Sequence, residues 1–345
     1  MNNIDDDWEN FLEDDNCLSI DTSQSNKLIN KPKFTDLYIS TKTKICYLNS
    51  EIDIHNLFWK IQLINYDEFK EGIIKKQIKV SCINEEQVEV LEQNLKSQKN
   101  NIININNLSK IDNPQGRIKF KDIRKISVGI CKKDLINSRS KKKSAFYNCF
   151  VVIIRLLFNN TFKEIHVKVF NTGKLEIPGI QSDEMLYKIL DYLKNYLKEF
   201  YPDINYNNKS ETVLINSNFS CGFYIDRDKL FNILRYNYNI NSCYDPCSYP
   251  GIQSHFYYDI EDDIDNQDGL QKNNKNQTKI SFMIFRTGSI LIVGKCEDNI
   301  IYYIYNFIKK IINHEFQIIS KEENFTKKQT INKKNKRKNI VVIES

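Results

Sequence analysis

Eight short segments rich in hydrophobic residues are predicted to be strands, and in two of them, 162–170 and 278–285, hydrophobic and polar residues alternate as in strands that bury one face. The predicted strands lie at 37–45, 150–158, 162–170, 175–177, 213–221, 252–258, 278–285 and 290–293. In two places a Thr-Gly dipeptide separates successive strands. Glycine tolerates the positive φ that a tight turn needs, so both places predict antiparallel hairpins.

Apolar residues spaced by three or four positions predict four amphipathic helices. Two of them, at 53–66 and 228–238, follow the predicted strands 37–45 and 213–221. The other two follow the hairpins. The stripe from Leu186 to Leu197 marks one of the latter, and the stripe from Ile301 to Ile312 marks the other. Ser182, with two acidic residues directly after it, is a suitable N-cap for the first of these long helices.

The hairpins are copies of one another, at a constant offset of 115 residues. Residues 169–179 read VFNTGKLEIPG and residues 284–294 read IFRTGSILIVG, without a gap. The preceding strand–helix pairs repeat more weakly at an offset of about 176, because the first copy holds extra chain between Tyr66 and Phe150. The repeat predicts an α+β fold of two tandem pseudo-symmetric units that share one antiparallel sheet, with all helices on one face.

Composition divides the chain into compact and polar parts. The two repeats are predicted at 31–200, with a polar insertion at about 84–116 and a helix at 85–97, and at 201–318, with a polar loop at 261–277. Residues 1–30 are predicted to be an acidic, disordered tail, and residues 319–345 a basic tail. The formal net charge of +6 conceals this arrangement: residues 1–26 carry eight acids and no Lys or Arg, so the remaining chain carries +14.

Several functional classes lack support in the sequence. No apolar run approaches the length of a membrane helix, and no secretory leader is evident, so the nine cysteines are expected to stay reduced in an intracellular compartment. Neither GxGxxG nor a phosphate-binding P-loop occurs. Cys243 and Cys247 lack a second ligand pair, so no metal is predicted. We expect no cofactor, no small-molecule substrate and no catalytic activity.

The two hairpins resemble those of the TATA-box-binding protein family. That family carries I-F-x-S-G-K-x-x-x-T-G at this place in each half, and Tyr249-Pro250-Gly251-Ile252 is similar to its F-P-G-L. Phe285-Arg286-Thr287-Gly288-Ser289 and the stretch 145–150 look closer to the divergent copies of large nucleocytoplasmic DNA viruses. The resemblance implies a saddle-shaped sheet with helices on its convex face, which binds and kinks DNA through the minor groove.

The resemblance also implies a set of DNA-binding residues. Phe170 and Phe285 match the wedge phenylalanines, Tyr249 matches another wedge, and either Cys149 or Phe150 matches the fourth. Base or groove contacts are expected from Asn216, Ser40, Pro178 and Val293. Phosphate contacts are expected from Lys141, Lys142, Lys143, Arg155, Lys168, Lys174, Arg286 and Lys295.

By resemblance, the function is transcription initiation on A/T-rich double-stranded promoter DNA, with a factor IIB-like protein and RNA polymerase as partners. A viral factory, a virion or a nucleus is the expected location. One alternative is a saddle that binds proteins after losing sequence-specific DNA binding. Another is an accessory domain of an enzyme, against which the absence of a carboxylate cluster argues. The acidic N-terminus is interpreted as a DNA mimic or a polymerase contact, and the basic tail as a nucleic-acid or nuclear-import patch or simply a solvated end.

Overall fold

A computed structural model describes residues 31–98, 101–136, 146–263, 266–272 and 276–321. The chain divides into two compact units. We call residues 43–211 the N-repeat unit, and residues 212–321 together with 31–42 the C-repeat unit. The predicted N-terminal tail and residues 322–345 of the predicted basic tail lie outside the described residues.

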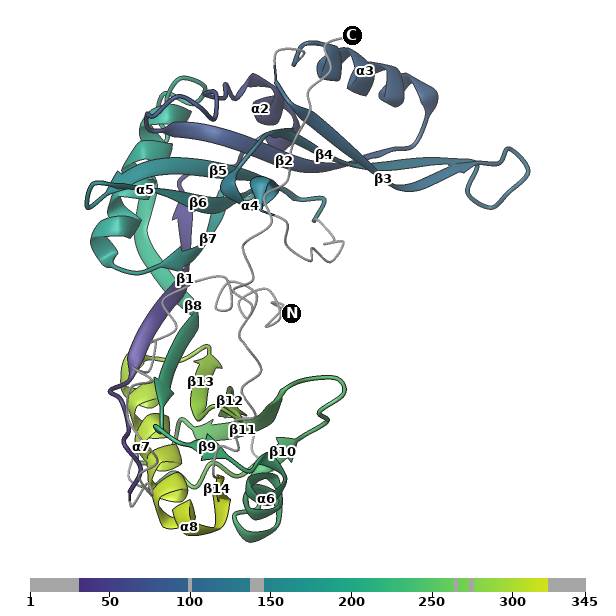
Figure 1. The fold of residues 1–345 in the computed structure, drawn as a ribbon. Coiled ribbons are helices and arrows are strands. Elements are labelled where there is room, and N and C mark those ends of the chain that lie inside the picture. The colour runs from purple at the N-terminus through teal and green to yellow at the C-terminus, as the bar shows by residue number, and fades with distance from the viewer. Residues whose placement is uncertain (1–30, 99–100, 137–145, 264–265, 273–275, 322–345) are drawn as a thin grey trace. The chain divides into compact units, whose positions relative to one another are not determined.

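The strands of the N-repeat unit follow the predicted pattern and add to it (Figure 1). They hydrogen-bond in the order β1-β7-β6-β5-β2-β4-β3. Their bounds are β1 (Tyr38–Leu48), β2 (Gly72–Cys82), β3 (Ile103–Asp112), β4 (Phe120–Gly129), β5 (Cys149–Phe158), β6 (Thr161–Phe170) and β7 (Lys174–Ile180).

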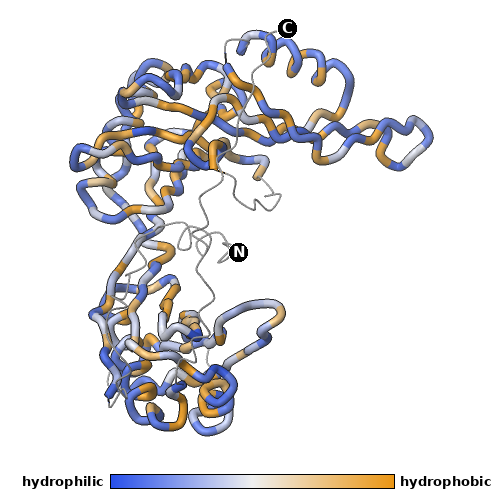
Figure 2. Tube along the Cα trace, in the orientation of Figure 1, coloured by the Kyte–Doolittle hydropathy of each residue, from blue (hydrophilic) through white to orange (hydrophobic). Residues whose placement is uncertain are grey.

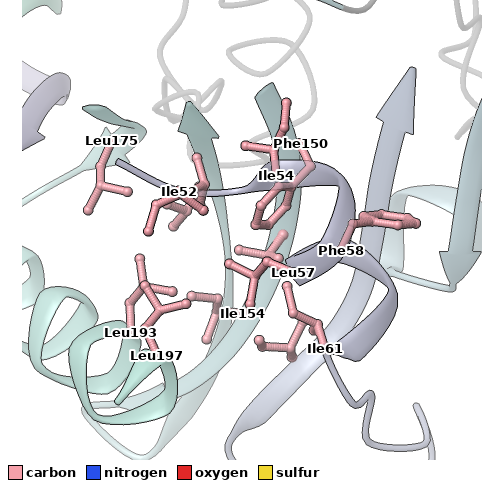
Figure 3. Close-up of a cluster of buried hydrophobic side chains, with 14 of the residues drawn as sticks. Ile52, Ile54, Leu57, Phe58, Ile61, Phe150, Ile154, Leu175, Leu193 and Leu197 are labelled. Carbon is pink, nitrogen blue, oxygen red and sulfur yellow. The ribbon is translucent and has the colours of Figure 1, made fainter. Parts of the chain in front are cut away.

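Three helices pack on one face of this sheet: α2 (Ile54–Lys60), α3 (Glu85–Lys96) and α5 (Asp183–Leu197). Their apolar side chains meet every second residue of the strands, because successive strand residues point to opposite faces. Figure 3 shows this core, in which Leu193 and Leu197 of α5 and Leu57 of α2 approach Ile154 of β5. The predicted cap of α5 is confirmed, since Ser182 Oγ accepts a hydrogen bond from the Met185 N–H.

The C-repeat unit repeats the same plan. Its strands run in the order β10-β11-β12-β13-β8, and β8 neighbours β1. Its elements are β8 (Tyr206–Ser220), β9 (Tyr224–Ile225), α6 (Arg227–Asn232), a π-helical turn η1 (Ile233–Asn237), β10 (Asn241–Cys243), β11 (Gly251–Asp259), β12 (Gln277–Phe285), β13 (Ser289–Gly294), α7 (Asp298–His314), α8 (Phe316–Ile319) and β14 (Ser320–Lys321).

The core of the C-repeat unit again lies between helices and one sheet face. Ile301, Ile304 and Ile308 of α7 pack with Phe282 and Ile292 of the sheet. Hydrophobic and hydrophilic residues are interspersed along the chain of both units (Figure 2), and alternate residues are buried along β6 and β7. The α+β fold with one antiparallel sheet of repeated design is therefore confirmed, and β8, α6, β10, β11, β12, β13 and α7 correspond in order to β1, α2, β2, β5, β6, β7 and α5.

The hairpin copies share their register as well as their sequence. Lys168 pairs with Glu176 across β6 and β7, and Met283 pairs with Leu291 across β12 and β13. Met283 lies 115 positions after Lys168, and Leu291 lies 115 positions after Glu176. Positions that correspond in sequence therefore correspond in space within their own units.

The first repeat differs by an insertion between β2 and β5. The predicted helix in it is confirmed as α3, but β3 and β4 are additional, and they extend the sheet beyond β2 (Figure 1). The prediction that every helix lies on one face is wrong for the short α4 (Lys132–Leu135). Cys131, directly before it, packs with Ile74 and Ile153 on the opposite face of the sheet.

Two predicted helices are shorter in the structure than their apolar spacing suggested. The helix predicted at 53–66 ends at Lys60, where the buried Lys76 Nζ donates to the carbonyls of Phe58 and Ile61. The helix predicted at 228–238 changes to the π-helical turn after Asn232.

The last described residues of the C-repeat unit are joined to its hairpin turn. Strand β14 pairs with β9, with Lys321 opposite Tyr224, and Lys321 Nζ lies 3.9 Å from a carboxylate oxygen of Asp226. The N–H of Ile225 donates to the carbonyl of Arg286 in the turn between β12 and β13. We call this arrangement the β9–β14 clasp.

Candidate nucleic-acid interface

Each unit has one sheet face that its long helices leave uncovered, which we call its open face. In the C-repeat unit this face carries an apolar cluster separate from the core. The cluster comprises Met283, Phe285, Leu291 and Val293, with Leu214 and Tyr249 packed against it. The neighbouring residues Phe282, Ile284, Ile290 and Ile292 belong to the helix-side core, as strand alternation requires.

Phe285 lies at the end of β12, directly opposite Gly251 of β11. A Cβ atom at position 251 would lie 2.7 Å from Cε1 of Phe285, so glycine leaves room for the ring. The ring of Tyr249 lies 6.0 Å from that of Phe285, tilted by 59°. The Tyr-Pro-Gly-Ile motif thus borders the Phe285 ring, and its tyrosine is an aromatic neighbour of that ring.

Phe170 has the corresponding place in the N-repeat unit. It ends β6 opposite Cys149, it is half-buried, and Nζ of Lys174 lies 5.0 Å from its ring centre. The turn after each phenylalanine is the same: Gly173 and Gly288 donate to the carbonyls of Phe170 and Phe285, each at 3.0 Å. Both glycines have φ near +80°, at +75° and +81°, where a side chain would be strained.

Asn216 lies in β8 beside the apolar cluster, opposite Val293 of β13. Its Nδ2 donates to Thr41 Oγ1 at 3.3 Å, and within the described part of the chain its buried Oδ1 has no hydrogen-bond partner. Ser40 Oγ donates to the Asn216 carbonyl at 3.0 Å. The structure therefore brings Asn216, Val293 and Ser40 together in the C-repeat unit.

The structure removes Phe150 from the candidates for a DNA contact. This side chain is buried and lies 6.2 Å from the ring of Phe58, on the helix side of β5 (Figure 3). Cys149 is the residue that faces the open side, where it pairs with Phe170. The position that the resemblance matches to a fourth wedge is therefore occupied by Cys149, which has no flat ring to insert between base pairs.

Arg155 is also corrected from a phosphate contact to a structural residue. It is buried on the open-face side of β5, and its guanidinium donates to the carbonyls of Tyr66, at 2.8 Å, Asn65, at 3.3 Å, and Glu68, at 2.5 Å. The rings of Tyr66 and Phe162 lie within 6 Å of it, at 5.3 and 5.7 Å. Through these three hydrogen bonds Arg155 anchors the loop after α2. Its guanidinium is therefore used inside the protein and is not offered to a phosphate.

The other predicted basic residues have different surroundings. Lys174 and Arg286 flank the two hairpin turns, and the Arg286 guanidinium lies 5.5 Å from the ring of Tyr224. Lys295 is exposed after β13. Lys168 pairs with Glu176 at 2.7 Å, and Pro178 is half-buried two residues further along β7. Lys141, Lys142 and Lys143 lie outside the described residues.

Some open-face residues were not singled out from the sequence. Glu176 is the clearest of them, and counting every second residue back from Pro178 along β7 would have found it. In the C-repeat unit His255 Nδ1 lies 3.2 Å from Ser281 Oγ. Burial, and then the charge of Lys279, lowers the pKa of His255, so its ring is uncharged at neutral pH. This open face is thus mainly apolar and uncharged.

Within the described ranges, no group of three or more His, Cys, Asp or Glu residues is placed to hold a metal ion. Cys243 and Cys247 are both exposed. No helix among these residues is long and apolar enough to cross a membrane.

Comparison with known proteins agrees with the resemblance carried by the hairpins. The chain is 28% identical over 205 residues to a TATA-box-binding protein-like protein of Acanthamoeba polyphaga mimivirus, which is 52% of each of the two sequences. It therefore spans about half the length of that relative. No family model matches the chain.

A search of solved structures returned the TBP of Methanococcus jannaschii, at a TM-score of 0.37 and 13% identity, covering 82% of this chain and 99% of that one. The repeated order of strands and helices places the fold in the class of duplicated α+β proteins. Within that class, the chain is similar to TATA-box-binding-like proteins.

Proposed function

We propose that this protein is a non-enzymatic transcription initiation factor of the TATA-box-binding-like kind. It binds A/T-rich promoter DNA through the minor groove, bends it, and recruits a factor IIB-like protein and RNA polymerase. The observation that carries the proposal is the matched placement of Phe170 and Phe285. Both lie on an open face, at the end of a strand, directly before the same Thr-Gly turn.

The chemistry around the two phenylalanines suits insertion between base pairs. Unstacking a base step requires a flat, uncharged surface that replaces part of the lost stacking. The C-repeat face supplies such a surface with Phe285, Tyr249 and their apolar neighbours. Lys174 and Arg286 lie at the adjacent turns, where a cation can neutralise a phosphate.

Asn216 supports recognition of A·T pairs in particular. In the minor groove, A·T and T·A pairs present only acceptors, whereas a G·C pair adds the amino group of guanine. The side-chain amide of Asn216 lies beside the apolar cluster, and its Nδ2 already donates to the neutral hydroxyl of Thr41. A groove acceptor can take the place of that hydroxyl.

The test compares DNA bending by the wild type and by the double variant Phe170→Ala/Phe285→Ala. Duplex probes labelled at both ends, either A/T-rich or G/C-rich, are titrated over a salt series. We expect the wild type to bend the A/T-rich probe, and the variant to lose bending and about tenfold in affinity per ring, the order expected from lost base stacking. Phe285→Leu keeps the apolar cluster filled and serves where alanine disturbs folding.

The matched control is Tyr187→Ala/Tyr302→Ala. These exposed tyrosines also differ by 115 positions, but they lie on α5 and α7. They should leave bending intact. Equal, unbent and fully salt-suppressed binding by all forms would contradict the proposal and favour the alternative of a protein-binding module.

A further inference from the structure

The open faces of the two units differ at one pair of equivalent positions. The C-repeat unit has Met283 opposite Leu291. The N-repeat unit has Lys168 opposite Glu176, in the same register of the same hairpin. An ion pair thus stands in one repeat where the other has two apolar side chains.

The carboxylate of Glu176 is held in a defined position. Its Oε1 lies 2.7 Å from Lys168 Nζ, and the Glu176 side chain is only 14% exposed. The hydrogen bond from Lys168 uses Oε1, one of the two acceptor oxygens of this carboxylate. Phe170, on the same face and two residues after Lys168, ends the same strand. A duplex seated on Phe170 therefore brings its groove to this carboxylate.

A carboxylate is a poor neighbour for an A·T pair and a good one for a G·C pair. The minor-groove edges of adenine and thymine present only acceptors, which would face the acceptor oxygens of Glu176 without any proton between them. The amino group of guanine is the single hydrogen-bond donor in that groove. Lys168 keeps the carboxylate paired, so its burial against DNA leaves no isolated charge.

We infer that Glu176 is a specificity-determining residue that accepts a hydrogen bond from the 2-amino group of a guanine. The inference rests on the proposed function. The N-repeat unit then selects a G·C pair at one position of the bound site. The C-repeat unit has Leu291 at the equivalent place, so it requires A·T at every base pair that it contacts.

The test uses an A/T-rich duplex in which a single G·C pair is moved through every position. Wild-type affinity should fall at most positions and rise at one, by about tenfold to a hundredfold, the range for a hydrogen bond to a charged group. Replacing that guanine by inosine, which lacks only the 2-amino group, should remove the gain. An A·T pair at that position should gain the same affinity when its adenine is replaced by 2,6-diaminopurine, because this base adds a 2-amino group to the minor groove.

Two variants locate the effect on the protein. Glu176→Leu should abolish the preferred position and leave A/T affinity unchanged or higher. Met283→Lys/Leu291→Glu transplants the ion pair, and should create a second preferred position on the side of the site that the C-repeat unit covers. Thermal unfolding of each variant establishes that it is folded.

One set of results would contradict the role of Glu176 alone, and another would contradict both this role and the proposed function. If the wild type bends A/T-rich DNA but no position gains from guanine, or the gain survives Glu176→Leu or inosine, the role of Glu176 is wrong and the proposed function stands. If the wild type neither prefers nor bends any duplex, both are wrong.

Discussion

At the scale of single residues, Lys76 shows how one buried charge ends a helix. The side chain is fully buried, and its Nζ donates to two carbonyls at the end of α2, each at 2.8 Å. Removal from water lowers its pKa to about 8. The two carbonyls and the Phe58 ring, whose centre is 5.0 Å away, favour the charged form and limit this shift.

This lysine gives a prediction for the pH dependence of stability. Below pH 8 Lys76 is protonated in both states, so the folded state carries the full cost of its burial. Between about pH 8 and 10.5 the unfolded chain holds more protons than the folded one, so stability rises with pH, by at most about 3 kcal/mol.

Urea unfolding of the wild type and of Lys76→Met measures this effect. The difference between their free energies of unfolding isolates Lys76, because buried cysteines and tyrosines titrate equally in both proteins. The difference should shift in favour of the wild type from pH 7 to pH 10. A difference that stays constant would mean that Lys76 keeps an ordinary pKa.

Residue-scale errors in sequence interpretation have clear physical origins here. Phe150 and Cys149 could not be distinguished by alignment, and a slip of one residue in a strand moves a side chain to the other face. Arg155 was assigned correctly to the open-face side of β5. The sequence, however, gave no sign that the distant carbonyls of 65–68 would cover it. In contrast, the positions of Phe170 and Phe285 at the ends of their strands were predictable, because a duplicated turn fixed the register.

At the scale of elements, the repeat predicted the shared plan, and the insertion was only partly predictable. The helix α3 was expected from its apolar spacing, and it contributes Leu91 and Leu95 to the core. Strand β3 was missed because most of its residues are exposed, so its sequence lacks the alternation of a half-buried strand. Its place is set by nine residue pairs with β4 rather than by burial of its own side chains.

The burial of α3 gives a prediction about the insertion. Leu91 is 4% exposed in the core of the N-repeat unit, whereas its neighbour Val90 is 56% exposed. Leu91→Ala should lower the free energy of unfolding by about 2–5 kcal/mol, and Val90→Ala by less than about 0.5 kcal/mol. Chemical denaturation of the two variants measures both. Equal small losses would mean that α3 does not share the core of the first repeat.

At the scale of the whole molecule, charge is unevenly distributed along the chain. Residues 327–345 hold seven Lys or Arg and one acidic residue, Glu344. Contacts with phosphates carry no sequence information, but they raise affinity and make it depend on salt. The basic tail and the open faces are therefore expected to contribute separable parts of DNA binding.

Truncation after Lys321 tests this separation. The shortened chain should bind A/T-rich and G/C-rich probes more weakly by the same factor, and the slope of log affinity against log salt should decrease by several units, because each phosphate contact contributes about 0.9. Bending of the A/T-rich probe should persist. A loss confined to the A/T-rich probe would instead place the tail in base recognition.

The β9–β14 clasp fixes where that tail starts. Lys321 pairs with Tyr224, whose ring lies beside the guanidinium of Arg286, the residue that follows Phe285. The next basic residue after Lys321 is Lys327, six residues further on, and six residues span at most about 20 Å. Once the Phe285 turn is on a duplex, the tail therefore meets the neighbouring phosphates at an effective concentration that approaches the millimolar range. Under the proposed function the second contact is intramolecular, and we expect the clasp to convert a weak charge attraction into a longer residence time on DNA.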